Sequence, residues 1–222
     1  KLMVKIVMTL IPDGKKGVED PGSPIYLDEN IISQPAAALQ LVAKEIFRMS
    51  DQVRDILKKT IELVKNEEVK SIDGLKENGE QVERLGKCIT EYLAALFSSG
   101  SLTEQQAAQT ASLMCVLSDV ERMGTLSVEM AECMLERSDR KYKYTPEAMD
   151  ELQKSLKVLN KMFCDSLKAL QGDDGIEPGK MMKRKDKLLD LDIKMRKAHI
   201  ERVNKGKCKA SLTAPFTNIL HL

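Results

Sequence analysis

The sequence lacks tryptophan, and aromatic residues make up only 4% of its 222 residues. It also lacks an excess of charge of either sign, because 35 Lys and Arg residues nearly balance 34 Asp and Glu residues. Proteins that bind nucleic acids usually carry a basic surface, often with aromatic side chains that stack on bases. Neither feature is present, so the sequence argues against nucleic-acid binding.

Long apolar runs and a leader sequence are missing as well. No stretch approaches the roughly 20 apolar residues that a membrane-spanning helix needs, and nothing resembles a signal peptide with a charged start and a small-residue cleavage site. The chain starts at Lys1 rather than at Met and stops at Leu222 inside an apolar pattern. We therefore expect a soluble piece of a longer protein.

Residues that commonly carry catalysis are scarce. The only two histidines, His199 and His221, lie in different expected helices, and neither has a nucleophile with a recognisable orienting partner. We expect His199 to be a packed, hydrogen-bonded helix residue. The cysteines lie far apart without a C-x-x-C pair, which predicts reduced core thiols; they are Cys88, Cys115, Cys133, Cys164 and Cys208. The sequence thus predicts no catalytic residues, no cofactor-binding residues and no small-molecule substrate.

What the sequence does contain is typical of helices. It has 12 methionines, 42% apolar residues and 31% charged residues, so an all-α fold is expected. A stretch rich in Gly and Pro, 13–28, predicts a linker that cannot form a packed element. Apolar residues spaced three and four positions apart then predict helices near 35–63, 82–96, 103–135, 146–170, 178–206 and 211–222.

Local signals mark the ends of these helices. Thr103 and Gln106 predict a capping box at the third helix. Gly124 lies on the apolar stripe of that helix, where glycine costs about 1 kcal/mol relative to alanine, so a close neighbouring helix is expected there. Cap-like Ser-Leu-Thr tripeptides, 101–103 and 211–213, precede the third and sixth helices and indicate a weak internal repeat.

Four short motifs occur in order along the chain. Tyr26-Leu27-Asp28-Glu29 precedes Pro35 and Ala38-Leu39, and it is followed by E-x-x-R-M at 45–49, D-x-E-R-x-G at 119–124 and R-x-x-H-x-x-R at 196–202. Together they resemble the PhoU family, in particular the PhoU-like domain that follows the membrane part of bacterial sodium/phosphate cotransporters. The resemblance covers residues 26–222.

The resemblance implies two antiparallel three-helix bundles, the second truncated at its last helix. The expected organisation is a juxtamembrane-like segment and linker over 1–28, a first unit over 29–140 and an incomplete second unit over 141–222. Of the first segment, 1–11 is either the stretch leaving the last membrane helix or a short amphipathic helix docked on the bundle. Gly172-Asp173-Asp174-Gly175 is expected to be a turn, because it lacks the acidic spacing of a calcium loop.

The function implied is that of a regulatory domain of a sodium-dependent phosphate transporter, at the cytoplasmic face of the plasma membrane. Such a domain acts by protein contact and conformational coupling and is not an enzyme. The implied partners are the membrane transport domain of the same polypeptide and a second copy in a homodimer. The alternative is a free-standing PhoU-like regulator or scaffold of phosphate-uptake signalling.

A metal site is the remaining implication. The family's motif is a carboxylate, three residues and an Asp, which puts two acidic oxygens one helical turn apart. Here Glu121 fills the first position but Thr125 stands in the second. Glu121, Glu45 and Asp119 are the candidate ligands for a divalent or iron-type metal. The competing interpretation is a solvated acidic flank made of Glu121, Glu129 and Glu132.

Overall fold

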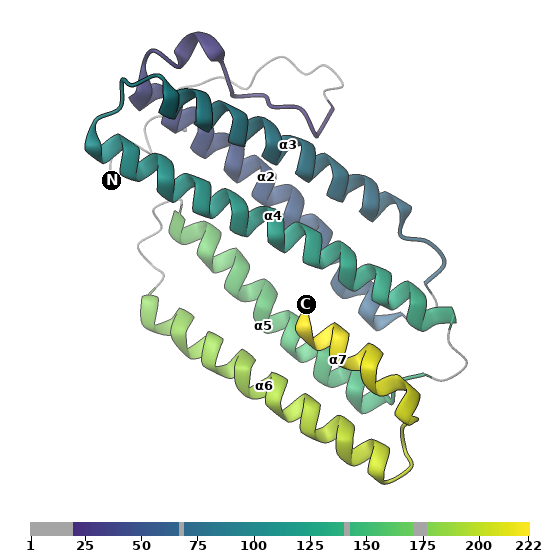
Figure 1. Ribbon diagram of the computed structural model, residues 1–222. Coiled ribbons are helices and arrows are strands. Elements are labelled where there is room, and N and C mark those ends of the chain that lie inside the picture. Colours follow the sequence, from purple (N-terminus) through teal and green to yellow (C-terminus); the bar gives the residue numbers. More distant parts are fainter. Residues whose placement is uncertain (1–19, 67–68, 140–142, 171–176) are drawn as a thin grey trace. The chain divides into compact units, whose positions relative to one another are not determined.

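The computed structural model describes residues 20–66, 69–139, 143–170 and 177–222. Every regular element in these ranges is a helix, which confirms the all-α fold (Figure 1). The elements are η1 (Glu29–Ile31), α2 (Pro35–Lys65), α3 (Asp73–Ser98), α4 (Glu104–Asp139), α5 (Pro146–Leu170), α6 (Pro178–Asn204), η2 (Ala210–Leu212) and α7 (Thr213–His221). No helix in these ranges has both the length and the apolar character to cross a bilayer. The expectations for 1–11 and 172–175 lie outside the described residues.

The contacts within the chain divide it into two compact units, and the boundary between the units falls inside the long helices α2 and α4. The first unit is Lys1–Val53 with Glu77–Thr125, and the second is Arg54–Lys76 with Leu126–Leu222. The C-terminal parts of α2 and α4 therefore belong with α5, α6 and α7. This division differs from the expected domain boundaries at 28 and 140. The reason is that α2, with 31 residues, and α4, with 36, each extend from one compact unit into the other. The repeat-based boundaries remain a prediction.

The first unit packs α2, α3 and α4 through the apolar stripes that the sequence predicts. In this unit α3 buries Val82, Leu85 and Ile89, and α2 buries Leu39, Val42, Ile46, Met49 and Val53. Gly124 of α4 confirms the expected close approach, because a Cβ added there would stand 3.3 Å from Val53 Cγ2 and 3.4 Å from Val82 Cγ1.

The start of α4 confirms the predicted capping box. The amide of Gln106 donates to Thr103 Oγ1 over 3.3 Å, and the amide of Thr103 donates to Gln106 Oε1 over 2.9 Å. Gly100, just before this start, has a φ of 67°, which glycine adopts without strain. Two amides at the start of α4 are thus satisfied by local side chains.

The second Ser-Leu-Thr tripeptide behaves differently. At the start of α7 no side chain caps the helix, and Thr213 Oγ1 lies 3.2 Å from His199 Nε2 of α6 instead. The reason is the residue three positions on, which is Gln106 in the first case and Phe216 in the second. Phe216 stacks on His199 with 4.5 Å between ring centroids. The capping prediction is therefore wrong at α7, whereas His199 is packed and hydrogen-bonded as expected.

In the second unit α5 and α6 run antiparallel. Arg202, near the end of α6, donates to both carboxylate oxygens of Glu151, near the start of α5, over 3.1 Å. Near the other ends Arg184 pairs with Asp165. Ion pairs therefore fasten both ends of this helix pair.

The cysteines are all free, as predicted, but they are not all core thiols. Only Cys208 is buried, and Cys115 is exposed on α4. The correction follows from helix geometry, because Cys115 lies two residues from the buried Leu117 and therefore points to another side of the helix.

Candidate functional site

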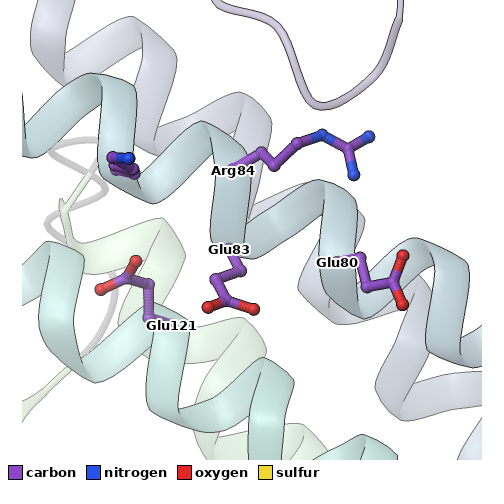
Figure 2. Close-up of a pocket in the computed structure, with 5 residues that line it drawn as sticks. Glu80, Glu83, Arg84 and Glu121 are labelled. Carbon is purple, nitrogen blue, oxygen red and sulfur yellow. The ribbon is translucent and has the colours of Figure 1, made fainter.

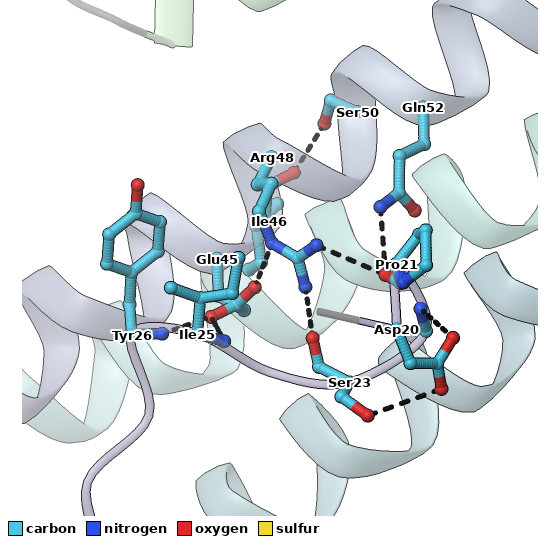
Figure 3. Close-up of polar contacts among 11 residues, drawn as sticks. Asp20, Pro21, Ser23, Ile25, Tyr26, Glu45, Ile46, Arg48, Ser50 and Gln52 are labelled. Carbon is cyan, nitrogen blue, oxygen red and sulfur yellow. Dashed lines mark hydrogen bonds and ion pairs between the residues drawn. The ribbon is translucent and has the colours of Figure 1, made fainter. Parts of the chain in front are cut away.

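The first site is built around Glu45, a fully buried carboxylate on α2 (Figure 3). Its Oε2 accepts hydrogen bonds from the backbone amides of Ile25, over 2.9 Å, and Tyr26, over 2.7 Å. Its Oε1 accepts a bond of 2.5 Å from Arg48 Nε. Both oxygens are thus used, and the buried charge is balanced by an adjacent guanidinium.

Arg48 and Gln52 extend these contacts along the same face of α2. Arg48 donates to the carbonyl oxygens of Pro21, over 3.1 Å, and Ser23, over 2.6 Å. Gln52 Nε2 also donates to the Pro21 carbonyl, over 2.9 Å. We call Glu45, Arg48 and Gln52, with the backbone of residues 21–26 that they bind, the clasp.

Residues 20–28, the described part of the expected linker, form no helix or strand, as its composition predicts. Helix side chains of the first unit nevertheless bind backbone groups of several of these residues, as the clasp shows. Outside the clasp, the Tyr92 hydroxyl of α3 donates to the Asp28 carbonyl over 2.8 Å, and Arg84 lies 3.4 Å from Asp20. A segment rich in Gly and Pro can therefore be fixed in place when a helix supplies its hydrogen-bond partners.

The second site is an open pocket of about 560 Å³ between α3 and α4. It is lined by Glu80, Glu83, Arg84, Lys87 and Glu121, which we call the acidic pocket. Figure 2 shows Glu83 and Glu121 facing the space between the two helices, whereas Arg84 extends away from it.

Glu121 is held in this pocket with no compensating partner. Burial raises the pKa of its carboxyl above the ordinary 4.5, and the nearby Glu83 raises it further. Within the described ranges its side chain makes no hydrogen bond or ion pair. Gly86 makes room for it, because a Cβ on Gly86 would stand 1.9 Å from Glu121 Oε1. Glu121 is therefore available to a proton or to a cation from outside.

The three predicted metal ligands have separate surroundings. Glu121 lines the acidic pocket, Glu45 is saturated by the clasp, and Asp119 lies exposed on α4. Asp119 and Glu121 are two residues apart, so they point to nearly opposite sides of the helix. Among the described residues no three His, Cys, Asp or Glu side chains gather as a metal site would require. Metal ligation by Glu121, Glu45 and Asp119 remains a prediction.

The neighbours of Glu121 in sequence do not join it. Thr125 Oγ1 donates to the backbone carbonyl of Glu121 over 3.3 Å, and Glu132 pairs with Lys76 over 2.8 Å in the second unit. Glu129 is exposed, as a solvated flank predicts. Sequence reasoning missed Glu83 and Gly86, since the contacts of α3 with α4 depend on a register between helices that a single sequence does not show.

Comparison with known proteins supports the helical interpretation. The family model for the PhoU domain matches residues 46–134. The chain is 24% identical over 175 residues to the phosphate-specific transport system accessory protein PhoU homolog 1 of Thermotoga maritima. The matched region covers 79% of this chain and 73% of the relative. No solved structure matches significantly. The residues similar to the PhoU domain therefore include most of α2, all of α3 and nearly all of α4, with Arg48, Gln52 and the acidic pocket.

Proposed function

We propose that the chain is a regulatory domain of phosphate transport that acts by protein contact rather than by chemistry. The observation that carries the proposal is the clasp, which ties a segment without secondary structure to the core helix α2. The similarity to an accessory protein of phosphate-specific transport names the process. A non-enzymatic role agrees with that accessory function.

The clasp supplies a physical route for conformational coupling. A displacement of residues 21–26 must either carry α2 with it or break the bonds to Glu45 and Arg48. Breaking them would take two amide donors from the buried Glu45 carboxylate and two carbonyl acceptors from Arg48, which is costly. Two arrangements, clasped and released, would thus differ in free energy, and a partner that binds one of them better would shift the balance.

In its finer form the proposal assigns the chain to a sodium-dependent phosphate cotransporter. Its partner is then the membrane transport domain of the same polypeptide, and it lies at the cytoplasmic face of the plasma membrane. The four motifs support this form, as does the position of the clasp on the segment that leads into α2. The second candidate is a free-standing regulator of phosphate uptake, which the accessory role of the Thermotoga relative favours.

Membrane fractionation of the full-length gene product separates these two forms. If the product resists extraction by carbonate and enters detergent micelles, the cotransporter form is supported. If it is recovered entirely in the soluble fraction, the free-standing form is supported instead.

Uptake of radioactive phosphate by cells tests the shared proposal. Deleting the gene should change uptake in phosphate-rich relative to phosphate-starved medium, and the intact gene should restore it. Glu45→Gln should restore it poorly at an equal protein level. The matched control is Asp55→Asn, which neutralises an exposed carboxylate of α2 whose one ion pair among the described residues is with Lys58. Uptake that does not respond to the deletion in either medium would refute the proposal.

A metal at the acidic pocket is a separate proposal. The pocket presents Glu83 and Glu121 without a third gathered ligand, fewer groups than a divalent cation usually takes from protein alone. The fit is therefore poor, and regulation by the clasp does not require a metal. Elemental analysis of protein purified without chelator, beside Glu121→Ala, tests this. Equal metal content in both proteins would remove Glu121 from any metal site.

A further inference from the structure

An unusual share of the exposed apolar surface lies on α6. Among the described residues seven large apolar side chains are exposed, and four of them belong to this helix: Met182 (57% exposed), Leu189 (56%), Ile193 (65%) and Ile200 (56%). Burial of the other face of α6 is already achieved through Met195, His199 and Arg202. A second apolar face on one helix indicates a docking surface.

The four residues lie on one line along the helix. They are separated by seven, four and seven positions, close to two, one and two helical turns. Asp186 and Arg196 complete this line, so that Met182, Asp186, Leu189, Ile193, Arg196 and Ile200 follow one another with alternating spacings of four and three. We call these six residues the seam. Alternate spacing of this kind is the pattern by which two helices pack along their length.

The spacing of the seam is the same in both directions. When a second seam is laid against the first in the antiparallel direction, Leu189 faces Ile193, Met182 faces Ile200, and Asp186 faces Arg196. Every apolar residue then meets an apolar residue, and every charge meets its opposite. In the parallel direction Asp186 would face Asp186 and Arg196 would face Arg196, which is repulsive. Two equivalent charged layers therefore set the direction, as polar layers do in coiled coils.

We propose that α6 pairs antiparallel with α6 of a second copy of this chain through the seam. Asp186 is available for this contact, because it makes no hydrogen bond or ion pair within the described ranges. Arg196 donates to Asp192 over 3.0 Å and to the Leu220 carbonyl over 3.1 Å, which holds its guanidinium at the edge of the same face.

The charges beside the seam favour a helix partner over a lipid surface. Lys185, Asp190, Asp192 and Lys197 flank it, so both signs are present in equal number. A helix that binds anionic lipid carries mainly Lys and Arg beside its apolar face. Mixed flanks are instead typical of helices that pair with each other.

Sedimentation across a concentration series tests the proposal on the wild-type chain and on exposed-site variants. Ile193→Lys should abolish the dimer, since Ile193 contributes to both central layers. Asp186→Arg should raise the Kd of the dimer by about tenfold or more, because it places like charges in contact twice. Lys187→Glu is the matched control, since Lys187 is exposed on another side of α6, and it should leave the Kd unchanged.

The charge-swapped variant D186R/R196D tests the direction of pairing. It should dimerise more tightly than Asp186→Arg alone, since the opposite charges face each other again. Circular dichroism must show full helix content in each variant, because Arg196 also binds the end of α7. A wild-type chain that remains monomeric throughout, or that binds anionic vesicles without self-association, would overturn the proposal. So would Ile193→Lys dimerising like the wild type.

Discussion

The clasp and the acidic pocket are two regions of the same helical unit, and each contains a glutamate that the sequence marks as a candidate ligand. Glu45 in the clasp is fully buried and accepts three hydrogen bonds. Glu121 in the pocket is only partly buried and accepts none from the described residues, while Glu83 faces it. The carboxylate of Glu45 therefore serves to hold the fold together, whereas that of Glu121 has no such role among the described residues.

The difference shows why a carboxylate motif alone does not define a site. A buried charge survives only when its oxygens are satisfied, so Glu45 is a positioning residue for segment 21–26. A desolvated carboxylate without partners carries an electrostatic cost, and such costs are often found where a protein binds something. Removing the two carboxylates should therefore have opposite effects on stability.

Glu45→Ala should break the clasp and give the largest effect. It leaves two amides without their acceptor and Arg48 Nε without its carboxylate, so we expect a loss of about 3 kcal/mol in the free energy of unfolding. Urea unfolding followed by circular dichroism measures it. Asp55→Asn should change stability by no more than about 0.5 kcal/mol, since its carboxylate is exposed. Equal losses for the two variants would contradict the clasp.

Gly86→Ala should disturb the pocket without harming the fold. The added methyl would push the flexible Glu121 side chain aside, while alanine is favoured over glycine by up to about 1 kcal/mol in a helix. We expect a gain in thermal stability. Gly124→Ala is the matched control, because its methyl would meet the packed Val53 and Val82 side chains, and its gain should be smaller. A larger gain for Gly124→Ala would show that a methyl group fits less well beside Glu121 in the pocket than beside Val53 and Val82 in the core.

Glu121→Gln should give the smallest effect and the opposite sign to Glu45→Ala. Above the folded-state pKa the carboxylate is charged in both states, and the folded state bears the cost of burial and of Glu83. As pH falls through that raised pKa towards 4.5, the folded state takes up a proton first and the cost disappears. The variant should thus be more stable by a fraction of a kcal/mol near neutral pH and indistinguishable below 4.5. Unfolding curves of the wild type and the variant at both pH values measure this difference. A difference in stability that is the same at the two pH values would contradict the raised pKa of Glu121.

Much of the fold was predictable, because the sequence signals of a helix lie within the helix itself and at its ends. The apolar period placed α2, α4 and α5 closely, and the box of Thr103 and Gln106 placed the start of α4. The same Ser-Leu-Thr pattern misled at α7, where Phe216 replaces the glutamine and a contact with His199 replaces the cap. Local patterns hold until a tertiary contact competes for the same side chain.

The two sites were predictable only in part, because both depend on contacts between distant residues. The pair Glu45 and Arg48 is visible in the sequence, but its donors and acceptors lie 19 to 27 residues earlier, in a segment whose composition suggests no packed element. Glu83 meets Glu121 across two helices whose register no local signal fixes. What the sequence could not supply was the partner of each side chain.

Hydrogen exchange at the amides of Ile25 and Tyr26 tests the clasp most directly. Both amides donate to Glu45, so they should be strongly protected in the wild-type chain although they lie in no helix or strand. In Glu45→Ala this protection should vanish, and in Asp55→Asn it should persist. Free exchange of both amides in the wild type would show that segment 21–26 is not held to α2, and coupling through the clasp would have to be abandoned.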